Sequence, residues 1–326
     1  MKKVKLGLLA CGNIANKMAR AVTGTDNVEL YACGARSIER ALAFASKYNI
    51  PKAYGSYEEL LSDPEIELIY VSTPHSLHYQ YVKMSLEHGK NVICEKPFTT
   101  GEKQAAELFA LAREKGLFLM ECMWTRFLPA VRELKKLLDQ GEVGELLTLQ
   151  LMFGQDLRHV NRLMSPELAG GALLDMGIYS VTTADLYFGD DIKNICSTAR
   201  MSDRGVDLTN VVMFDYGNGK TATVGSSAIA VMDNTAYIMG SEGYVILKSF
   251  SSMTEFTVVK GPAATTYTYP NALRGNGFEH ELSEAADCIR KGKLESDILP
   301  GDKTIYMMGL LDRIRKQWGM VYPFEK

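Results

Sequence analysis

The sequence predicts an α/β fold in two parts: an N-terminal doubly wound parallel sheet, followed by an α+β domain with a mainly antiparallel open sheet. Three observations predict it. Apolar runs of strand length alternate with helical patterns up to about residue 123. The loops between them are short, which favours parallel pairing and right-handed crossovers. Beyond that point, several extended runs are separated by tight turns. We therefore assign residues 1–123 to the first domain and residues 124–326 to the second.

The elements of the first domain follow from short apolar runs, which are typical of strands buried on both faces of a sheet. The expected strands cover residues 4–10, 28–35, 66–72, 91–95 and 117–123. The expected helices cover residues 13–22, 37–47, a short stretch before Pro64, 75–88 and a stretch ending at Gly116.

Three helix starts carry capping signals. Ser37 is expected to cap the second helix of the first domain. Ser56 with Glu59, and Thr99 with Glu102, have the spacing of capping boxes, in which a hydroxyl and a carboxylate satisfy each other's backbone N–H groups. These signals place two further helices between the predicted strands.

The elements of the second domain are more varied. Helices are expected at residues 129–140, 170–189, 279–290 and 304–318, a strand at 146–153, and several extended runs at about 192–260. Residues 215–220 read Asp-Tyr-Gly-Asn-Gly-Lys, which indicates a hairpin because Asn and Gly accept positive φ.

Composition excludes several classes of protein. The chain has 326 residues, 46% of them hydrophobic and 23% charged, which is normal for two globular domains. A net charge of −3 provides no electrostatic attraction to nucleic acid or to an anionic membrane. No apolar run is long enough to span a bilayer, no signal peptide is expected, and the six cysteines include no C-x-x-C pair. These cysteines fit small buried side chains in a reducing compartment, so we expect a cytoplasmic protein.

A glycine turn joins the first strand to the first helix. Against the pattern G-x-G-x-x-G/A, Ala10 stands at the first position, Gly12 at the second and Ala15 at the third. The middle glycine lets the backbone approach a pyrophosphate, which would then bind the N–H groups at the start of the helix, at Asn13 and Ile14. This context favours a dinucleotide-binding Rossmann domain. The alternative is a tight turn without a ligand.

The end of the second strand bears on the choice of dinucleotide. NAD enzymes usually carry an acidic residue here for the ribose hydroxyls. This chain has none, and instead places Arg36 24 residues after Gly12, with Ser37 beside it and Arg40 one turn later. A guanidinium and a hydroxyl suit a 2′-phosphate, so we predict NADP over NAD. The alternative is that both arginines are solvated surface charges.

Two other strand ends carry polar residues. Thr73, Pro74 and His75 follow one buried strand, and Glu95 with Lys96 ends the next. Ligands of parallel sheets bind outside the carboxyl ends of the strands, so Lys96 is expected beside the nicotinamide. His75 and His78 have no third ligand at a useful spacing, and we expect no metal.

The sequence resembles the glucose–fructose oxidoreductase, inositol dehydrogenase and rhizopine catabolism family (Gfo/Idh/MocA). The matching elements are the Gly12 turn, Thr73-Pro74 with His78, Gly89-Lys90 leading into Glu95-Lys96-Pro97, and residues 170–179, Gly-Gly-Ala-Leu-Leu-Asp-Met-Gly-Ile-Tyr. Residues 50–57 and 124–127 also resemble the subgroup of dimeric trans-dihydrodiol dehydrogenases and NADP-dependent D-xylose dehydrogenases.

The resemblance implies roles for matching residues. Lys96 corresponds to the lysine of the E-K-P motif, often with a cis bond into Pro97. Asp175 and Tyr179 correspond to the D-x-x-x-[H/Y] pair, and their spacing puts both on one helical face. The expected cofactor-binding residues are Ala10, Gly12, Asn13, Ile14, Arg36, Ser37, Arg40, Thr73, Pro74, His75, His78, Glu95 and Lys96.

The expected chemistry is oxidation of an alcohol, which sends a hydride to the nicotinamide and needs a base for the hydroxyl proton. A free tyrosine has a pKa of ~10, and a nearby lysine cation lowers it. We expect Tyr179 as the acid/base, Lys96 as its electrostatic partner and ligand of the substrate hydroxyl, and Asp175 as the orienting group. The roles of Tyr179 and Lys96 could be reversed. Asp175 and Tyr179 could also simply decorate an interdomain helix.

Aromatic walls suit sugars or flat diols, and Trp124, Phe153 and the neighbouring Arg126 are candidate substrate contacts, together with Asp175 and Tyr179. Trp124, Arg126 and Phe153 could equally be core packing. The expected substrate is a sugar, polyol or trans-diol, and the sequence does not name it.

Two rival functions stay open. One is a non-catalytic regulator of the same fold that binds the dinucleotide as a signal, although such proteins tend to lose the lysine or the acid/base residue. The other is a biliverdin-reductase-like enzyme, against which the stretch at residues 170–179 argues.

Oligomerisation is indicated by extended runs such as 210–214 and 237–239, which carry apolar residues on both alternating faces. A sheet covered by helices on one side would then have a second apolar face to bury. We expect a homodimer or homotetramer formed through the C-terminal sheet, as the family resemblance also implies.

Overall fold

The computed structural model describes residues 2–325, which form two compact units. The first unit contains the residues up to Trp124 together with Leu273–Met308, and the second contains Thr125–Ala272 and the residues from Gly309 onward. The chain first leaves unit 1 between Trp124 and Thr125. The return of residues 273–308 to unit 1 differs from the predicted division, because a helical pattern does not reveal which sheet the helix packs on.

Unit 1 contains a six-stranded parallel sheet in the order β3-β2-β1-β4-β5-β6, which confirms the doubly wound architecture. Its strands are β1 (Val4–Leu9), β2 (Val28–Gly34), β3 (Lys52–Tyr54), β4 (Leu68–Val71), β5 (Asn91–Glu95) and β6 (Leu119–Cys122). The edge strand β3 was not expected, since its three residues are only half-buried and form no apolar run.

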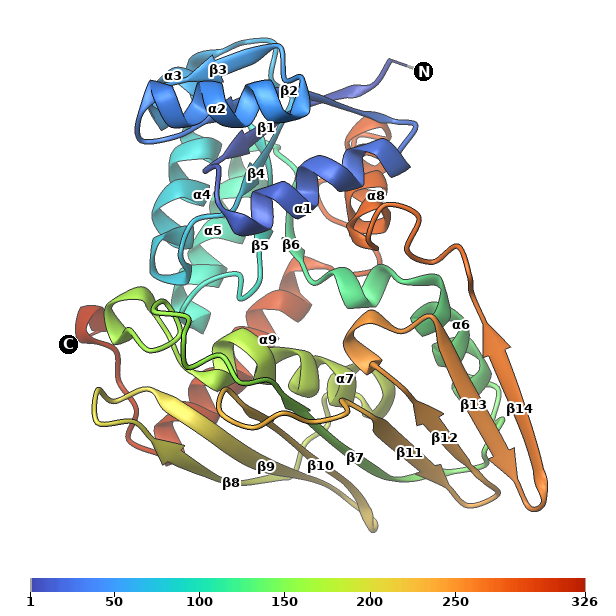
Figure 1. Ribbon diagram of the computed structural model, residues 1–326. Coiled ribbons are helices and arrows are strands. Elements are labelled where there is room, and N and C mark those ends of the chain that lie inside the picture. Colours follow the sequence, from blue (N-terminus) through green and yellow to red (C-terminus); the bar gives the residue numbers. More distant parts are fainter. Residues whose placement is uncertain (1, 326) are drawn as a thin grey trace. The chain divides into compact units, whose positions relative to one another are not determined.

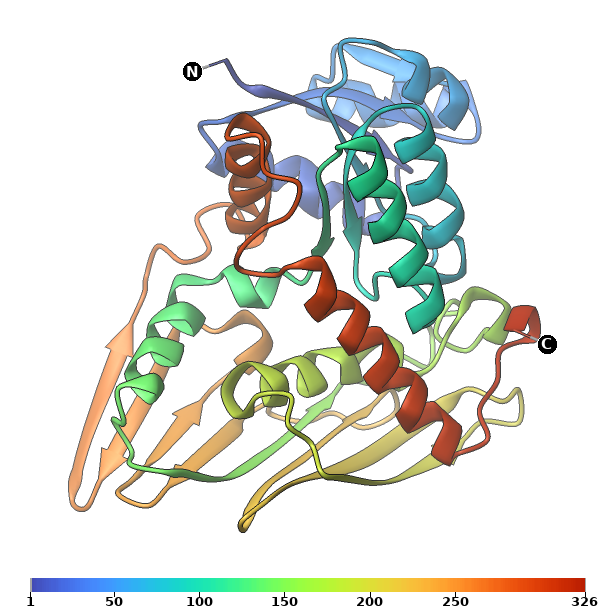
Figure 2. The same ribbon diagram turned by 180° about the vertical axis from the view of Figure 1, so that it is seen from behind.

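Helices cover both faces of this sheet. They are α1 (Asn13–Ala21), α2 (Ile38–Tyr48), α3 (Tyr57–Ser62), α4 (His78–Glu87), α5 (Glu102–Lys115) and α8 (Phe278–Arg290), with short 3₁₀ turns at Val22–Gly24, His75–Leu77 and Trp124–Phe127. Helices α1 and α8 lie side by side against one face and α4 and α5 against the other (Figures 1 and 2). The buried residues of β1, β4 and β5 between these layers form the core of unit 1.

Two of the predicted caps are confirmed and one is wrong. Ser37 accepts a hydrogen bond from the Arg40 N–H, and Ser56 accepts one from the Glu59 N–H. The capping box of Thr99 and Glu102 does not form, because the Thr99 hydroxyl donates to the carbonyl oxygen of Gly101 at 2.8 Å. Helix α5 therefore begins after Gly101 without a side-chain cap.

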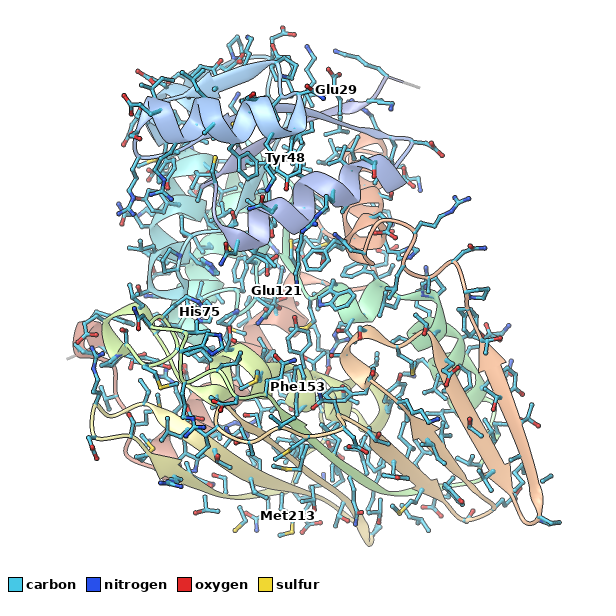
Figure 3. The ribbon with its side chains drawn as sticks, viewed as in Figure 1. Glu29, Tyr48, His75, Glu121, Phe153 and Met213 are labelled. Atoms are coloured by element: carbon cyan, nitrogen blue, oxygen red, sulfur yellow. The ribbon has the colours of Figure 1, made fainter. Side chains whose placement is uncertain are left out.

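Three buried glutamates lie close together in the interior of unit 1. Glu95 at the end of β5 accepts a hydrogen bond from the Tyr70 hydroxyl, and Glu281 on α8 is fully buried. Glu121 on β6, labelled in Figure 3, accepts hydrogen bonds from the Phe98 N–H at 3.1 Å and from the Thr304 hydroxyl at 3.2 Å. Burial, together with the charges of Glu95 and Glu121, raises the pKa of Glu281 well above its ordinary range. The environment of Glu281 therefore favours the neutral form of its carboxyl group.

Unit 2 contains an eight-stranded sheet in the order β14-β13-β12-β11-β7-β10-β9-β8. Its strands are β7 (Leu146–Gly154), β8 (Asn194–Met201), β9 (Asp207–Gly217), β10 (Lys220–Ser227), β11 (Ala236–Gly240), β12 (Tyr244–Leu247), β13 (Glu255–Lys260) and β14 (Ala263–Thr268). Neighbours pair antiparallel except β7 with β10, as a mainly antiparallel sheet requires. Asn218 and Gly219 have positive φ between β9 and β10, which confirms the predicted hairpin.

One face of this sheet is covered by helices. A π-helical turn at Leu173–Gly177 continues into α7 (Ile178–Phe188), which contacts β7 and β10, and α6 (Pro129–Asp139) contacts α7 and β13 (Figure 1). Helix α9 (Gly301–Gln317) is divided between the units at residues 308/309. No helix within residues 2–325 is both long and apolar enough to cross a membrane.

Replacing Ala10 by glycine is expected to stabilise the protein. Ala10 has a φ of +85°, in the left-handed region that costs an L-residue about 1–2 kcal/mol. The Ala10→Gly variant should therefore unfold at higher denaturant concentration, with a gain of about 0.5–1 kcal/mol after the added entropy of the unfolded chain is subtracted. In the control Ala106→Gly, inside helix α5, the same change should destabilise by about 1 kcal/mol. Equal losses in both variants would contradict this account of Ala10.

Replacing Glu281 by glutamine is expected to change how stability depends on pH. The folded pKa of Glu281 lies above its unfolded value of ~4.3, so its contribution is complete below that value and is lost as pH rises toward the folded pKa. Glutamine does not ionise. The free energy of unfolding of Glu281→Gln relative to wild type should therefore increase by at least about 1 kcal/mol between pH 5 and pH 8. The exposed Glu29, labelled in Figure 3, provides the control Glu29→Gln, which should show no such increase. A pH-independent difference for Glu281→Gln would refute the prediction.

Candidate active site

The turn between β1 and α1 has space for a ligand. Gly12 precedes α1 in extended backbone, and a Cβ atom built on it would meet no atom within 4 Å. The packing of the protein itself therefore does not require glycine here, whereas close approach of a pyrophosphate would. Asn13 and Ile14 form the first turn of α1, which contains no acidic residue to repel an anion.

The end of β2 brings basic side chains to this turn. Arg36 and Arg40 are exposed, and both act electrostatically on the buried Tyr57. Burial raises the pKa of Tyr57, while the two guanidinium groups oppose the rise. The Ser37 hydroxyl caps α2 at 3.4 Å from the Arg40 nitrogen. Arg36 and Arg40 thus form an exposed basic group beside the strand end, close to the buried Tyr57.

His78 connects the ends of β4 and β5. It is fully buried, and its ring nitrogens face the carbonyl oxygens of Pro97 at 2.8 Å and Thr73 at 2.9 Å. The peptide bond between Lys96 and Pro97 is cis, as the family resemblance implied. His78 therefore links the backbone after β4 to the backbone after β5. The half-exposed Lys96 precedes Pro97, one of the two residues that His78 contacts.

The other predicted residues of these strand ends are mostly enclosed. His75, labelled in Figure 3, is buried with its ring centroid 5.7 Å from that of His78, and Pro74 precedes the 3₁₀ turn that begins at His75. Glu95 is buried against Tyr70 inside the unit, so its carboxylate does not lie with the exposed groups of the turn. Among residues 2–325, no three His, Cys, Asp or Glu side chains are grouped so as to hold a metal ion.

In unit 2, a buried carboxylate holds the start of the segment that carries Asp175 and Tyr179. Asp207 accepts hydrogen bonds from the Leu173 N–H at 2.9 Å and from the Asn210 amide at 2.8 Å. Gly171 has a φ of +115°, and a Cβ atom there would overlap Asp207 Oδ1. Burial raises the pKa of Asp207 to about 6, although both hydrogen bonds oppose the rise. Gly171 is therefore explained by the close approach of Asp207, whereas a Cβ atom on Gly170 would overlap the carbonyl oxygens of Arg162 and Leu163.

Asp175 and Tyr179 have partners that the sequence did not indicate. Arg162 forms an ion pair with Asp175 at 2.8 Å between Nη2 and Oδ1. The Tyr179 ring lies edge-on to Phe153, with centroids 5.6 Å apart, and Phe153 (labelled in Figure 3) packs edge-on to Phe250 at 5.5 Å. Arg162 was missed because residues 155–172 show no periodic pattern, and Phe250 because it lies in an isolated 3₁₀ turn.

The other two predicted substrate contacts, Trp124 and Arg126, belong to different units. Trp124 belongs to unit 1, where its ring stacks on Phe278 with centroids 5.1 Å apart. Arg126 belongs to unit 2 and is buried in an ion pair with Asp185. This ion pair gives Arg126 a structural partner, whereas the ring of Phe153 lies against that of Tyr179.

Two family models match the chain. Residues 4–122 match the model described as "Oxidoreductase family, NAD-binding Rossmann fold", and residues 131–246 match the "GFO/IDH/MocA C-terminal domain". The order of the two matches agrees with the order of the two sheets along the chain.

Curated relatives match over the full length. The chain is 36% identical over 332 residues to trans-1,2-dihydrobenzene-1,2-diol dehydrogenase of Mus musculus and 35% identical over 331 residues to that of Homo sapiens, with 99% of each chain covered in both cases.

Solved structures have the same fold. A 3-ketoreductase from Actinomadura kijaniata, KijD10, crystallised with NADP and TDP-benzene, superposes with a TM-score of 0.88 at 25% identity over 97% of this chain and 98% of its own. The aldose-aldose oxidoreductase of Caulobacter crescentus, complexed with glycerol, gives a TM-score of 0.87 at 24% identity over 98% of both chains.

These matches confirm the resemblance predicted from the motifs around Gly12, Lys96 and Tyr179 and the expectation of an oxidoreductase. The chain belongs to the Gfo/Idh/MocA family of oxidoreductases with an NAD-binding Rossmann fold.

Proposed function

We propose that this protein transfers a hydride between NADP(H) and a CH–OH group of a sugar, polyol or trans-diol. The observation that carries the proposal is the arrangement around α7. A carboxylate held by Arg162 and a phenol against Phe153 stand four residues apart on one segment, as Asp175 and Tyr179. This is the pair of groups that an alcohol oxidation needs for its proton and for orienting its substrate.

Tyr179 takes the proton of the substrate hydroxyl in the proposed reaction. A lysine cation stabilises tyrosinate, and Lys96 is the residue in the family's E-K-P motif that would provide it. Asp175 is fixed by Arg162 and orients the substrate. The reverse assignment, with Lys96 as proton acceptor, involves the same residues. Bound NADP⁺ supplies the hydride acceptor.

The proposed cofactor fits the turn of unit 1. The open space at Gly12 and the first turn of α1 suit a pyrophosphate, and the exposed Arg36 and Arg40 suit a 2′-phosphate. The ketoreductase from Actinomadura kijaniata was crystallised with NADP, which supports the same choice. A regulator that binds the dinucleotide without turnover is the alternative, and it would not need Lys96 and Tyr179.

The proposed substrate class follows from the walls of unit 2 and from the names of the relatives. Phe153 and Phe250 provide flat apolar surface beside Tyr179, which suits the face of a sugar ring or a cyclic diol. The relatives at 35–36% identity are named as dehydrogenases of a trans-diol. The cytoplasmic location expected from the cysteines stays a prediction.

A homodimer or homotetramer through the sheet of unit 2 is part of the proposal. Val211, Met213 and Tyr237 are exposed on the face of the sheet opposite α7, and Met213 is labelled there in Figure 3. In β9 these exposed positions alternate with the buried Val212 and Phe214. An apolar face of this kind favours burial against a second copy.

Replacing Tyr179 by phenylalanine tests the reaction. The variant should lose about 100-fold or more of kcat, because the proton has no acceptor, while its dissociation constant for NADPH stays within about twofold of wild type. The control Tyr267→Phe removes a hydroxyl from a half-buried tyrosine stacked on Phe256 and should leave kcat unchanged. The assay is NADP⁺ reduction across aldoses, inositols and trans-diols. Full turnover in Tyr179→Phe would mean that another group is the base, and silence of the wild type with tight NADPH binding would favour the regulator.

Replacing Arg36 by alanine tests the cofactor preference. Loss of the guanidinium should raise KM for NADP⁺ on the order of tenfold and leave KM for NAD⁺ nearly unchanged, since only NADP⁺ carries the 2′-phosphate. The control Arg20→Ala removes an exposed arginine from α1 and should change neither value. A wild-type preference for NAD⁺ would contradict the assignment of Arg36.

Replacing Met213 by lysine tests the oligomer. A charge in the middle of the exposed apolar face should convert the protein to a monomer, as measured by light scattering on a sizing column. The control Leu42→Lys places the same charge on an exposed leucine of α2 and should leave the oligomer intact. A wild type that already elutes as a monomer would exclude this part of the proposal.

A further inference from the structure

Two cysteines meet at the dinucleotide turn. Cys11 stands between Ala10 and Gly12, and its thiol donates to the carbonyl oxygen of Gly34 at 3.5 Å. Cys33 is the residue before Gly34 on β2, and it lies opposite Leu8 in the parallel register of β1 and β2. The Ala10 N–H also bonds to the Gly34 oxygen, at 3.1 Å. The turn is therefore held against the end of β2 at the point where Cys33 lies.

The two thiols differ in exposure and in acidity. Cys11 is partly exposed, whereas Cys33 is buried with its thiol donating to the carbonyl oxygen of Ala41 at 3.5 Å. Hydrogen bonding by the Cys33 thiol, which favours the Cys11 thiolate, lowers the pKa of Cys11, and the charge of Arg40 lowers it further. The interaction with Cys11 raises the pKa of Cys33, and burial raises it further. This division suits an attacking thiolate at Cys11 and a resolving thiol at Cys33.

We propose that Cys11 and Cys33 form an oxidisable dithiol that closes to a disulfide inside the dinucleotide turn when the protein meets a hydroperoxide. The proposal concerns a modification site rather than the catalysed reaction. Its consequence for cofactor binding rests on the proposed function, because that function places the dinucleotide at this turn.

The chemistry balances with hydrogen peroxide as the oxidant. The Cys11 thiolate attacks one peroxide oxygen, so an S–O bond forms, the O–O bond breaks, and the leaving hydroxide takes up a proton as water. The Cys33 thiol then attacks the Cys11 sulfur, so an S–S bond forms, the S–O bond breaks, and the second oxygen leaves as water with the Cys33 proton. Two thiols lose two electrons in total, and one hydrogen peroxide becomes two waters.

Formation of the disulfide and binding of the dinucleotide should each disfavour the other. Closing the bond draws the Cys11 side chain toward β2 and so displaces the backbone of the neighbouring Ala10 and Gly12. Cys11 also interacts electrostatically with Arg40, which belongs to the basic group at the end of β2, and with the buried Tyr57. A dinucleotide bound there would hold the turn in its reduced geometry. By linkage, NADP⁺ should slow the oxidation and the disulfide should weaken NADPH binding by the same coupling.

Peptide mapping of the full-length protein tests the bond directly. Trypsin cleaves after Lys5, Lys17, Arg20 and Arg36, which places Cys11 alone in residues 6–17 and Cys33 alone in residues 21–36. Reduced protein is treated with hydrogen peroxide, alkylated, digested and analysed by mass spectrometry. We expect the two peptides joined, lighter by two hydrogen atoms than their sum, and separated again by dithiothreitol.

The variants distinguish this pair from the other thiols. Cys33→Ser should abolish the joined peptide and keep the activity of the reduced enzyme, whereas Cys196→Ser, which removes an exposed cysteine of β8, should leave the joined peptide in place. Absence of the joined peptide in the wild type, or its persistence in Cys33→Ser, would overturn the proposal.

A fluorescence titration with NADPH tests the coupling. The peroxide-treated wild type should bind NADPH on the order of tenfold more weakly than the reduced protein, and treated Cys33→Ser should not. A joined peptide with unchanged NADPH affinity would refute the coupling. A joined peptide in a protein that binds no NADPH even when reduced would instead refute the proposed cofactor site, while the dithiol itself would stand.

Discussion

The site in unit 1 depends on one constraint of parallel sheets: strands that run in the same direction finish at the same edge. The glycine turn follows β1, the basic group follows β2, Thr73 follows β4 and Lys96 follows β5. Residues from four separate stretches of sequence are brought together by this rule alone. His78 adds the local restraint, since it contacts the backbone after β4 and after β5 with one ring.

In unit 2, a single buried carboxylate fixes the start of the segment before α7. Asp207 comes from β9, yet it holds the Leu173 N–H at the start of the turn that carries Asp175. The carboxylate is fully buried, and burial without these bonds would be costly. Gly171 is the residue that allows the approach. The start of the segment that carries Asp175 and Tyr179 is therefore held by a residue that lies 28 positions after Tyr179 in the sequence.

The sequence predicted what depends on periodicity and on local backbone chemistry. The parallel sheet, the hairpin at Asn218 and the caps at Ser37 and Ser56 all follow from patterns within a few residues. The cap at Thr99 was wrong because a hydroxyl can donate as well as accept, and the pattern does not record which partner is nearer. Arg162 could not be predicted, because its ion pair with Asp175 joins an irregular loop to a helix. The packing of α8 in unit 1 could not be predicted for the same reason. It depends on long-range contacts, and an amphipathic pattern does not show which sheet a helix contacts.

Ala10 has a consequence for how such turns are recognised in other sequences. Its left-handed backbone is the conformation that the first glycine of the fingerprint normally adopts, so the geometry survives although the residue does not. A search that demands glycine at this position would pass over the chain, whereas one written in dihedral angles would accept it. A β-branched residue would be far more strained than alanine at such a site.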